Sequence, residues 1–248
     1  MKKCIGLICE GPTDRIVLRA IINHISQEEN DFRPIQPEPD CLGRYGNGWK
    51  GVWKWCEKNK KIIPHFLNDI VPCIDALVIH MDGDVSRKEK EAHCCCDKVP
   101  CELRNTSSPI DCIKISKGEC PVVLPCPAHP NTPNGNRIYL EGMIRQLSET
   151  ENEKTRIITM IPCDSTEAWV VSAFNDSEYP EKINDPWNNI ISRSKEYHGI
   201  RIRGKKKSSK LYEKFVPVLQ DNWTRVVKQC ESAADFDGQI RRLFFGKL

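Results

Sequence analysis

Long apolar runs are missing from this sequence of 248 residues. No stretch approaches the roughly 20 apolar residues that cross a bilayer, and the apolar run after Met1, Lys2 and Lys3 is too short for the core of a secretory signal peptide. We therefore expect a cytoplasmic protein without a membrane partner. A phosphate-binding loop of the form Gly-x-x-x-x-Gly-Lys-Ser/Thr is also missing, so any ATP-dependent step would need another chain.

An excess of one charge is missing as well. The formal net charge is only +3, so the average surface is not strongly cationic. Contact with nucleic acid would depend on a local patch, and one stretch supplies several basic side chains: Arg201, Arg203, Lys205, Lys206, Lys207 and Lys210. The same stretch is equally well interpreted as a solvated basic loop.

Apolar runs alternate with helical patterns along the chain. Three runs predict buried strands, at residues 4–9, 75–81 and 156–161. The proline-rich segment 33–39 predicts an extended edge strand, because proline cannot donate to a sheet ladder. Helices are expected from Pro12 and at about residues 50–68, 137–147 and 165–174. Strands that alternate with helices indicate an α/β protein with a mainly parallel sheet flanked by helices.

The expected organisation has four parts. Residues 1–92 form the first part of the sheet domain and residues 136–178 the second part. A cysteine-rich insertion at residues 93–135 separates them. Residues 179–248 form a helical C-terminal region that contains the basic loop. No internal repeat is present.

Four acidic residues directly follow two of the predicted strands. Glu10 and Asp14 follow the first strand, and Asp82 and Asp84 follow the second, with Gly83 between them. The carboxyl ends of parallel strands meet at one edge of a sheet, where ligands bind. Carboxylates crowded together there would repel one another and need a cation. Mg²⁺ (or Mn²⁺) is the expected cofactor, because it prefers oxygen ligands.

A third acidic pair, Asp164 and Glu167, follows the strand at 156–161. Three strand ends could hold two cations about 4 Å apart, the arrangement used to hydrolyse phosphodiesters. Other interpretations remain open. Asp164 or Ser165 could cap the following helix, which is the favoured interpretation of Asp164, and Asp14 could serve only the helix dipole. A lone Asp-x-Asp motif also occurs in sugar-nucleotide transferases and phosphatases.

The segments 10–18 (EGPTDRIVL) and 82–84 (DGD) resemble the motifs of the Toprim domain. The resemblance is to the form found in OLD-family nucleases and in the stand-alone Toprim proteins encoded beside ABC-type ATPases in bacterial anti-phage defence. Segment 162–169 (PCDSTEAW) resembles a Pro…Glu-Ala-Trp segment of those stand-alone proteins. The proline and threonine after Gly11 depart from the Glu-Gly-Lys form of primase-like relatives. A nucleophilic-tyrosine domain is missing too, so primase and topoisomerase functions are disfavoured.

The resemblance implies a Toprim-like fold and a metal-dependent endonuclease, a hydrolase that cleaves DNA or RNA. It implies that the site contains the Mg²⁺ ligands and a further ligand or supporting carboxylate: Glu10, Asp14, Asp82 and Asp84, with Glu167. OLD-type enzymes also place a lysine near the scissile phosphate. The candidates are Lys206 and Lys210, although Lys205 and Lys207 lie in the same stretch. The resemblance further implies an effector of antiviral defence controlled by an ABC-type or AAA ATPase partner. A homodimer is compatible with the sequence, which does not fix the oligomeric state.

Cysteine is concentrated in the insertion, where seven of the 14 cysteines fall between Cys94 and Cys126. In a reducing compartment this favours a metal site over a disulfide scaffold. Structural zinc takes four Cys or His ligands, and the candidates are Cys94, Cys96, Cys101, Cys120, Cys126 and His129. No paired Cys-x-x-Cys pattern is present, so unligated cysteines or a redox switch remain alternatives. Zn²⁺ binding would supply the folding energy of this polar segment.

Two other classes of function compete with the nuclease. One is a nucleic-acid-binding zinc protein whose Toprim fold is not catalytic. The other is a different Mg²⁺-dependent enzyme, such as a phosphotransferase that uses the pair Asp82 and Asp84.

Overall fold

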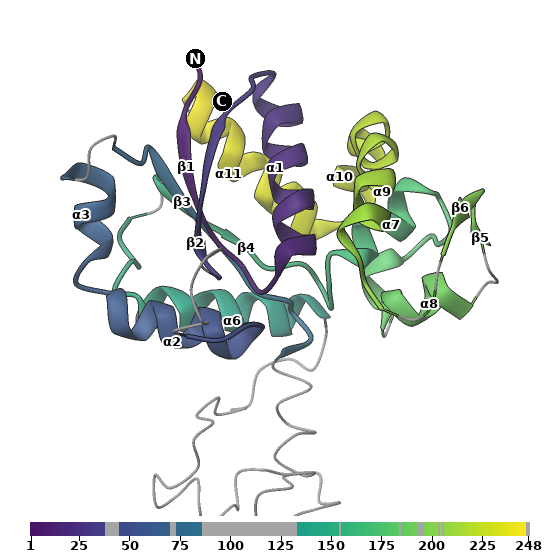
Figure 1. The fold of residues 1–248 in the computed structure, drawn as a ribbon, viewed down its shortest axis with the longest axis horizontal. Coiled ribbons are helices and arrows are strands. Elements are labelled where there is room, and N and C mark those ends of the chain that lie inside the picture. The colour runs from purple at the N-terminus through teal and green to yellow at the C-terminus, as the bar shows by residue number, and fades with distance from the viewer. Residues whose placement is uncertain are drawn as a thin grey trace, which may run out of the picture.

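The computed structural model describes residues 1–37, 45–69, 73–85, 133–153, 155–183, 185–192, 196–202, 204 and 206–246. Its centre is a four-stranded sheet in the order β2-β1-β3-β4 (Figure 1). The strands are β1 (Cys4–Ile8), β2 (Asp31–Gln36), β3 (Ala76–His80) and β4 (Ile157–Met160). All three strand pairings are parallel. The predicted α/β class and parallel sheet are therefore confirmed.

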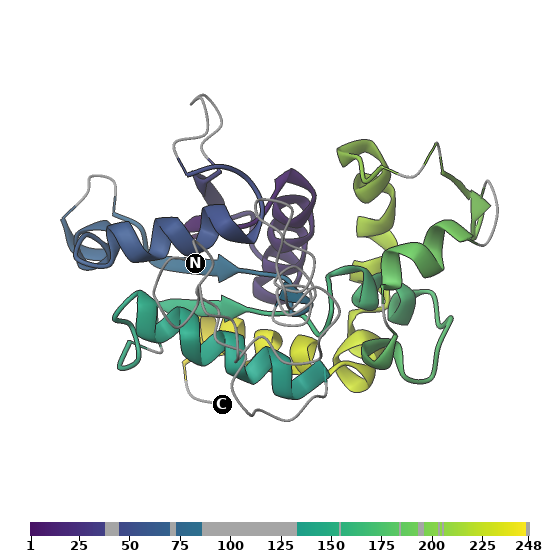
Figure 2. The same cartoon turned by 90° about the horizontal axis from the view of Figure 1, so that it is seen from below.

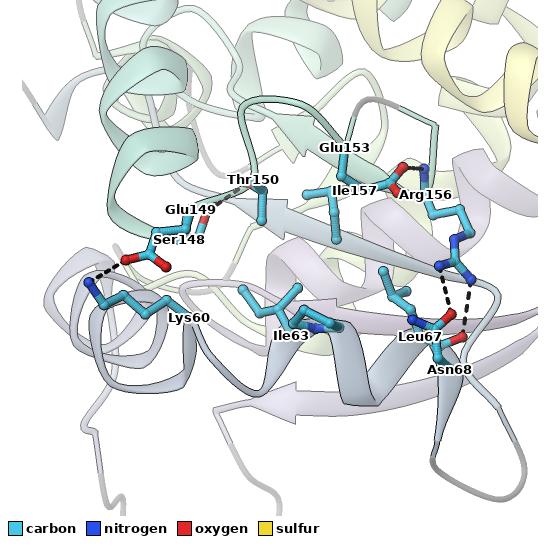
Figure 3. Close-up of a pocket in the computed structure, with 11 residues that line it drawn as sticks. Lys60, Ile63, Leu67, Asn68, Ser148, Glu149, Thr150, Glu153, Arg156 and Ile157 are labelled. Atoms are coloured by element: carbon cyan, nitrogen blue, oxygen red, sulfur yellow. Dashed lines mark hydrogen bonds and ion pairs between the residues drawn. The ribbon is translucent and has the colours of Figure 1, made fainter.

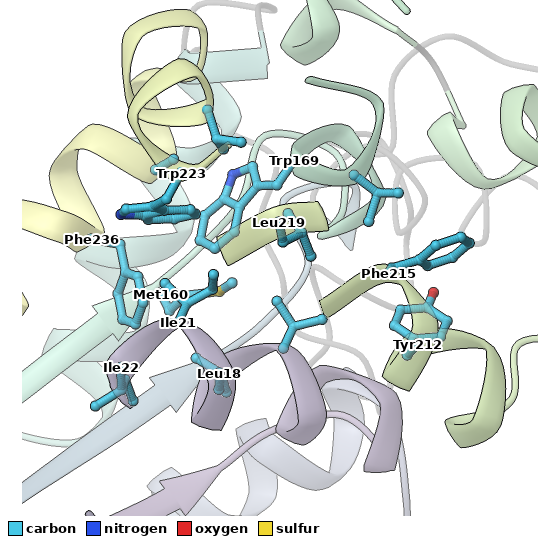
Figure 4. Packing of buried hydrophobic residues seen from close by; sticks show 14 of the residues in the cluster. Leu18, Ile21, Ile22, Met160, Trp169, Tyr212, Phe215, Leu219, Trp223 and Phe236 are labelled. Carbon is cyan, nitrogen blue, oxygen red and sulfur yellow. The ribbon is translucent and has the colours of Figure 1, made fainter. Parts of the chain in front are cut away.

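One face of the sheet packs against α1 (Pro12–Ser26) and α11 (Glu231–Phe245). Side chains alternate between the two faces along a strand, so Leu7 of β1 and Val78 of β3 point to this side. Figure 4 shows a part of this core, in which α1, β4 and the C-terminal helices contribute the labelled side chains Leu18, Ile21, Ile22, Met160, Trp169, Tyr212, Phe215, Leu219, Trp223 and Phe236.

The other face packs against α2 (Trp49–Asn59), α3 (Ile63–Asn68) and α6 (Pro133–Leu147). Ile8, Leu77, Ile79 and Ile157 point to this side and form a second core with these helices. A sheet that is covered on both faces must have apolar residues at nearly every strand position, and this explains why the strands read as unbroken apolar runs.

The C-terminal region is helical, as predicted. Most of it stands beside the sheet (Figure 2), and α11 returns to cover one face. Helix α7 (Glu167–Ala173) leads into it, and its own elements are η2 (Pro180–Lys182), α8 (Pro186–Ser192), β5 (Glu196–Tyr197), β6 (Ile200–Arg201), α9 (Ser209–Asp221), α10 (Trp223–Gln229) and α11. Trp169 anchors the region: its ring is fully buried, stacks 5.9 Å from Phe236 and meets Trp223 edge-on at 5.4 Å. Replacing such a buried aromatic by alanine typically costs about 3–5 kcal/mol.

Several element boundaries differ from the prediction. The helix expected at about 50–68 is two helices, because Pro64 has no N–H group and its ring clashes with the preceding turn. A short antiparallel hairpin, β5–β6, begins the basic stretch that was expected to be a loop. The proline-rich strand is at the sheet edge, as predicted, with Pro34 paired in register with Leu7.

The zinc prediction lies outside the described residues and stays a prediction. In the described part, the cysteines are free thiols, and Cys9, Cys56, Cys163 and Cys230 are buried in the core. No helix among the described residues is long and apolar enough to cross a bilayer.

Candidate metal centre at the carboxyl end of the sheet

Glu10 and Asp82 meet where β1 and β3 end. The two strands run side by side in parallel, with Ile8 paired to Ile79. Their following residues therefore emerge at the same edge. The Oε1 atom of Glu10 accepts a hydrogen bond from the backbone N–H of Asp82 at 2.8 Å. The predicted convergence of acidic residues from separate strands is confirmed for this pair.

Asp14 reaches the same point from the first turn of α1. Gly11 is the N-cap, in an extended conformation, and Pro12 starts the helix without the loss of a hydrogen bond. Asp14 is buried, and one of its oxygens accepts a hydrogen bond from the Thr166 hydroxyl at 3.4 Å. The ligand atoms of Asp14, His80 and Asp82 all lie within 4.8 Å of one another.

His80 is part of this group although the sequence analysis did not select it. It is the last residue of β3 and is fully buried. It shares a face with Val78, the face that α1 covers, and this alternation places the ring beneath Asp14. Oδ1 of Asp82 lies 3.4 Å from Nε2 of His80. The one feature of the sequence that could have identified His80 is its position at a strand end, two residues before Asp82.

Gly83 lets the strand-end segments after β3 and β4 lie against each other. The N–H of Gly83 donates to the carbonyl of Pro162 at 3.1 Å, and the N–H of Asp84 donates to the carbonyl of Asp164 at 2.9 Å. A Cβ atom on Gly83 would collide with the Pro162 carbonyl oxygen. Asp84 is buried, but its carboxylate is outside the group of ligand atoms within 4.8 Å that the described residues form.

Neither Asp164, for which capping was the favoured interpretation, nor Ser165 is the N-cap of α7. The N-cap of α7 is Thr166, because the helix begins two residues later than expected. Asp164 has a left-handed backbone with φ of 59°, a turn conformation that aspartate tolerates better than most residues. The turn brings Asp164 against Asp84 and leaves Glu167 in the first turn of the helix.

Buried Glu167 and partly exposed Lys207 form an ion pair at the edge of the acidic group. Glu167 is 0% exposed, and Nζ of Lys207 lies 2.9 Å from its Oε1 and 3.0 Å from its Oε2. The Tyr212 hydroxyl donates a hydrogen bond to the same carboxylate. Lys206 and Lys210, the two lysines predicted from the sequence, are exposed, as is much of Lys207. It is Lys207 that the structure places at the site, because its ammonium group contacts Glu167.

Burial, together with the neighbouring negative charges, raises the pKa values of the acidic groups. Burial, followed by the charge of Asp82, raises the pKa of Glu10 to about 8. Burial also raises the pKa of Asp14, and the nearby His80 partly opposes this. The pKa of Glu167 is raised by burial as well, although the Lys207 ammonium pulls it down. A cluster of carboxylates that resists ionisation is one that a cation would stabilise.

In His80 and Lys207, the nearby negative charges outweigh the effect of burial on the pKa. Burial lowers the pKa of His80, but the charges of Asp14 and Asp82 outweigh it, so that the pKa rises to about 9. Burial likewise opposes the charge on Lys207, yet Glu167 and Asp82 raise its pKa above the ordinary value. Both shifts report a strongly negative site.

The residues present fit a divalent cation. Asp14 and Asp82 offer carboxylate oxygens, and Glu10 lies beside them with its Oε1 on the Asp82 backbone. Oxygen-rich sets of this kind suit Mg²⁺ and Mn²⁺. Of the predicted ligands, the structure places Asp14 and Asp82 in one group of ligand atoms and holds Glu10 against the backbone of Asp82. The carboxylates of Glu10 and Asp84 are not members of that group, and Glu167 is paired with Lys207.

A separate hollow lies at the other end of β4, between α3 and the segment that leads into the strand (Figure 3). It has a volume of about 130 Å³. Charged side chains at its rim are paired: Lys60 lies 2.6 Å from Glu149, and Arg156 donates to the Leu67 carbonyl at 3.1 Å. Because the hollow lies at the start of β4 and its lining includes none of the acidic residues of the candidate metal site, it is separate from that site.

Comparisons of the chain with protein-family models, with curated proteins and with solved structures found no match.

Proposed function

We propose that this protein is a divalent-metal-dependent nuclease that hydrolyses phosphodiester bonds of DNA or RNA. One observation carries the proposal: acidic side chains that follow different strands meet at the carboxyl end of the sheet, with Oε1 of Glu10 on the backbone of Asp82 at 2.8 Å. A lysine stands next to them on a buried glutamate. Metal ligands beside a fixed positive charge are what cleavage of a polyanionic backbone requires.

The proposed roles follow from the contacts. Asp14 and Asp82 would hold the cation, and Glu10 would fix the backbone of Asp82 through its Oε1 and could offer its other oxygen. When bound, a divalent cation activates water and stabilises developing negative charge. Glu167 has both oxygens on Lys207, so its role is to position that lysine rather than to bind metal. Lys207, whose side chain is 34% exposed, can then face a phosphate of the substrate.

Neighbouring basic side chains supply contacts to the rest of the substrate. Arg201, Lys206 and Lys210 are exposed and flank Lys207 in the chain. Their charges would bind successive phosphates without regard to base sequence, which makes binding strongly salt-dependent. In this proposal Lys207 acts in catalysis, whereas the other basic side chains only bind the phosphates of the substrate.

The resemblance to stand-alone Toprim proteins extends the proposal to a partner. The chain has no phosphate-binding loop of its own. In the proposal, an ABC-type ATPase therefore senses the trigger and controls the nuclease during defence against phage. Control by a partner suits an activity that is toxic to its own cell.

The test is a cleavage assay with plasmid, single-stranded DNA and tRNA, in Mg²⁺ and in Mn²⁺, with and without an ABC-type ATPase encoded beside the gene. Asp82→Asn and Glu10→Gln are compared with the wild type. The matched controls are Asp31→Asn and Glu28→Gln, because those carboxylates lie at the surface and, among the described residues, form ion pairs with Lys2 and the N-terminus.

We expect metal-dependent cleavage that Asp82→Asn reduces by roughly 10²-fold or more and that the controls retain. Cleavage that persists unchanged in Asp82→Asn and Glu10→Gln contradicts the proposal. Binding without cleavage under every condition would favour a nucleic-acid-binding zinc protein. Transfer of a phosphoryl group to a small acceptor would favour a phosphotransferase.

A further inference from the structure

Neither ring nitrogen of His80 meets hydrogen-bond geometry with a described residue. Nδ1 has no partner among those residues, Nε2 only approaches Oδ1 of Asp82 at 3.4 Å, and the side chain is 0% exposed, so water does not reach it from the surface. Buried polar groups are nearly always satisfied, and an unsatisfied one costs about 1–3 kcal/mol. A fold that keeps such a ring at the end of a strand needs a reason for it.

The geometry supplies a reason. The imidazole lies within 4.8 Å of ligand atoms on both Asp14 and Asp82, and its Nε2 is 3.4 Å from Oδ1 of Asp82. Two atoms that bind one metal at roughly 2.0–2.2 Å each lie no more than about 4.4 Å apart. Three atoms evenly spaced around one ion lie no more than about 3.8 Å apart, so a contraction of up to about 1 Å would bring all three onto one ion.

We propose that His80 is a nitrogen ligand of the cation and that the site binds Mn²⁺ in preference to Mg²⁺. Mg²⁺ is a hard cation that takes oxygen ligands, whereas first-row transition metals accept imidazole as well as carboxylate. One nitrogen beside the oxygens of Asp14 and Asp82 therefore shifts selectivity toward Mn²⁺. The inference rests on the same site as the proposed nuclease, but its test does not depend on cleavage.

The competing role for His80 is that of a resident cation. A protonated ring would pair with Asp14 and Asp82 and would take the place of the metal charge. A ring in that role binds no metal, and its replacement would not change the relative affinity for two metals. The two roles therefore differ in a measurable way.

The experiment measures metal binding to the purified full chain in the absence of nucleic acid. Calorimetric titration gives the affinities for Mn²⁺ and for Mg²⁺. Pulsed electron spin resonance of bound Mn²⁺ detects a directly coordinated imidazole nitrogen. His80→Gln removes the ring, and His65→Gln is the matched control, because that histidine pairs with a carboxylate, Asp69, on the exposed surface of α3.

We expect Mn²⁺ to bind more than about tenfold more tightly than Mg²⁺ to the wild type and to His65→Gln. The preference should fall several-fold in His80→Gln, and the nitrogen signal should vanish. Wild-type protein with nitrogen-15 in its histidine rings keeps the test independent of the folding of the variant. Its Mn²⁺ signal must change to the nitrogen-15 pattern.

Mn²⁺ that binds without a nitrogen signal, or equal affinities for the two metals, overturns the inference. So does a failure to bind either metal. Cleavage in Mg²⁺ or Mn²⁺ without nitrogen coordination leaves the nuclease standing and removes the role of His80. Nitrogen coordination without any cleavage supports the ligand role and counts against the nuclease.

Discussion

Lys207 and Glu167 form an ion pair of 2.9 Å although 40 residues separate them in the chain. The glutamate comes from the first turn of α7 and the lysine from the segment before α9. Their contact fixes the basic segment against the acidic end of the sheet. It is the reason why one lysine of that segment differs from its neighbours.

Replacement of Lys207 should therefore separate catalysis from binding. We expect Lys207→Met to lower the rate constant of cleavage by roughly 10²-fold, because the positive charge beside the phosphate is lost. Lys206→Met and Lys210→Met should keep that rate constant and weaken nucleic-acid binding, with a smaller salt dependence. Single-turnover cleavage and binding titrations measure the two effects, and thermal unfolding confirms that each variant is folded. Equal losses of rate in all three variants would count against the assignment.

Tyr212 should support the buried carboxylate of Glu167. Tyr212→Phe removes the hydroxyl that donates to it and nothing else. Because a hydrogen bond to a buried charged group is lost, we expect a loss of about 1.5–3 kcal/mol in the free energy of unfolding. Tyr179→Phe is the matched control, since that side chain is 55% exposed and should change little. Urea unfolding compares them, and indistinguishable midpoints would contradict the role of the hydroxyl.

Gly83 should tolerate no side chain, because a Cβ atom there meets the Pro162 carbonyl oxygen. We expect Gly83→Ala to lower the free energy of unfolding by about 1–3 kcal/mol and to weaken metal binding, since Asp82 and Asp84 flank the displaced backbone. Gly142→Ala is the control: it lies in α6 with open space around it and should stabilise by about 0.5–1 kcal/mol. Denaturant unfolding and calorimetry measure both properties. A stable Gly83→Ala protein with normal metal affinity would refute the close approach.

The stability of the metal-free protein should fall as pH rises. Glu10 has a pKa of about 8 in the fold against an ordinary value of 4.5, so between these values only the unfolded chain loses this proton. His80 has a pKa of about 9 in the fold against an ordinary value of 6.5, so between these pH values it too stays protonated only in the folded state. The folded state binds more protons over both windows, and its stability therefore declines from pH 5 to pH 9, by on the order of a few kcal/mol.

Urea unfolding in a chelator, at pH 5, 7 and 9, measures this slope. Glu10→Gln should make the free energy of unfolding depend less on pH below pH 8, because the glutamine side chain does not titrate. Glu28→Gln, on the exposed surface, should keep the wild-type slope. A metal-free protein that grows more stable toward pH 9 would show that these groups are not crowded in the way the structure places them.

The sheet and most of the acidic convergence could be predicted from the sequence. Glu10 and Asp82 each follow an apolar run that forms a strand. The two strands are parallel, and parallel strands bring their carboxyl ends together. The break between α2 and α3 could have been read from Pro64. The predicted role of Asp164 failed because a left-handed turn, which spacing does not reveal, delays the start of α7.

Other site residues depend on contacts that no local pattern contains. His80 sits inside an apolar run and looks like core, because only the neighbouring Asp14 and Asp82 give its ring a chemical role. Spacing alone did not distinguish Lys207 from Lys206, since the choice is made by the distant Glu167.

Anomalous scattering from Mn²⁺ in crystals of the wild-type protein would locate the bound cation itself. We expect one strong peak between the side chains of Asp14, His80 and Asp82, within about 2.5 Å of their ligand atoms, and no peak there in Asp82→Asn. If Mn²⁺ at saturating concentration is found only elsewhere on the protein, and Asp14, His80 and Asp82 contact one another without a metal between them, the proposed metal site is wrong.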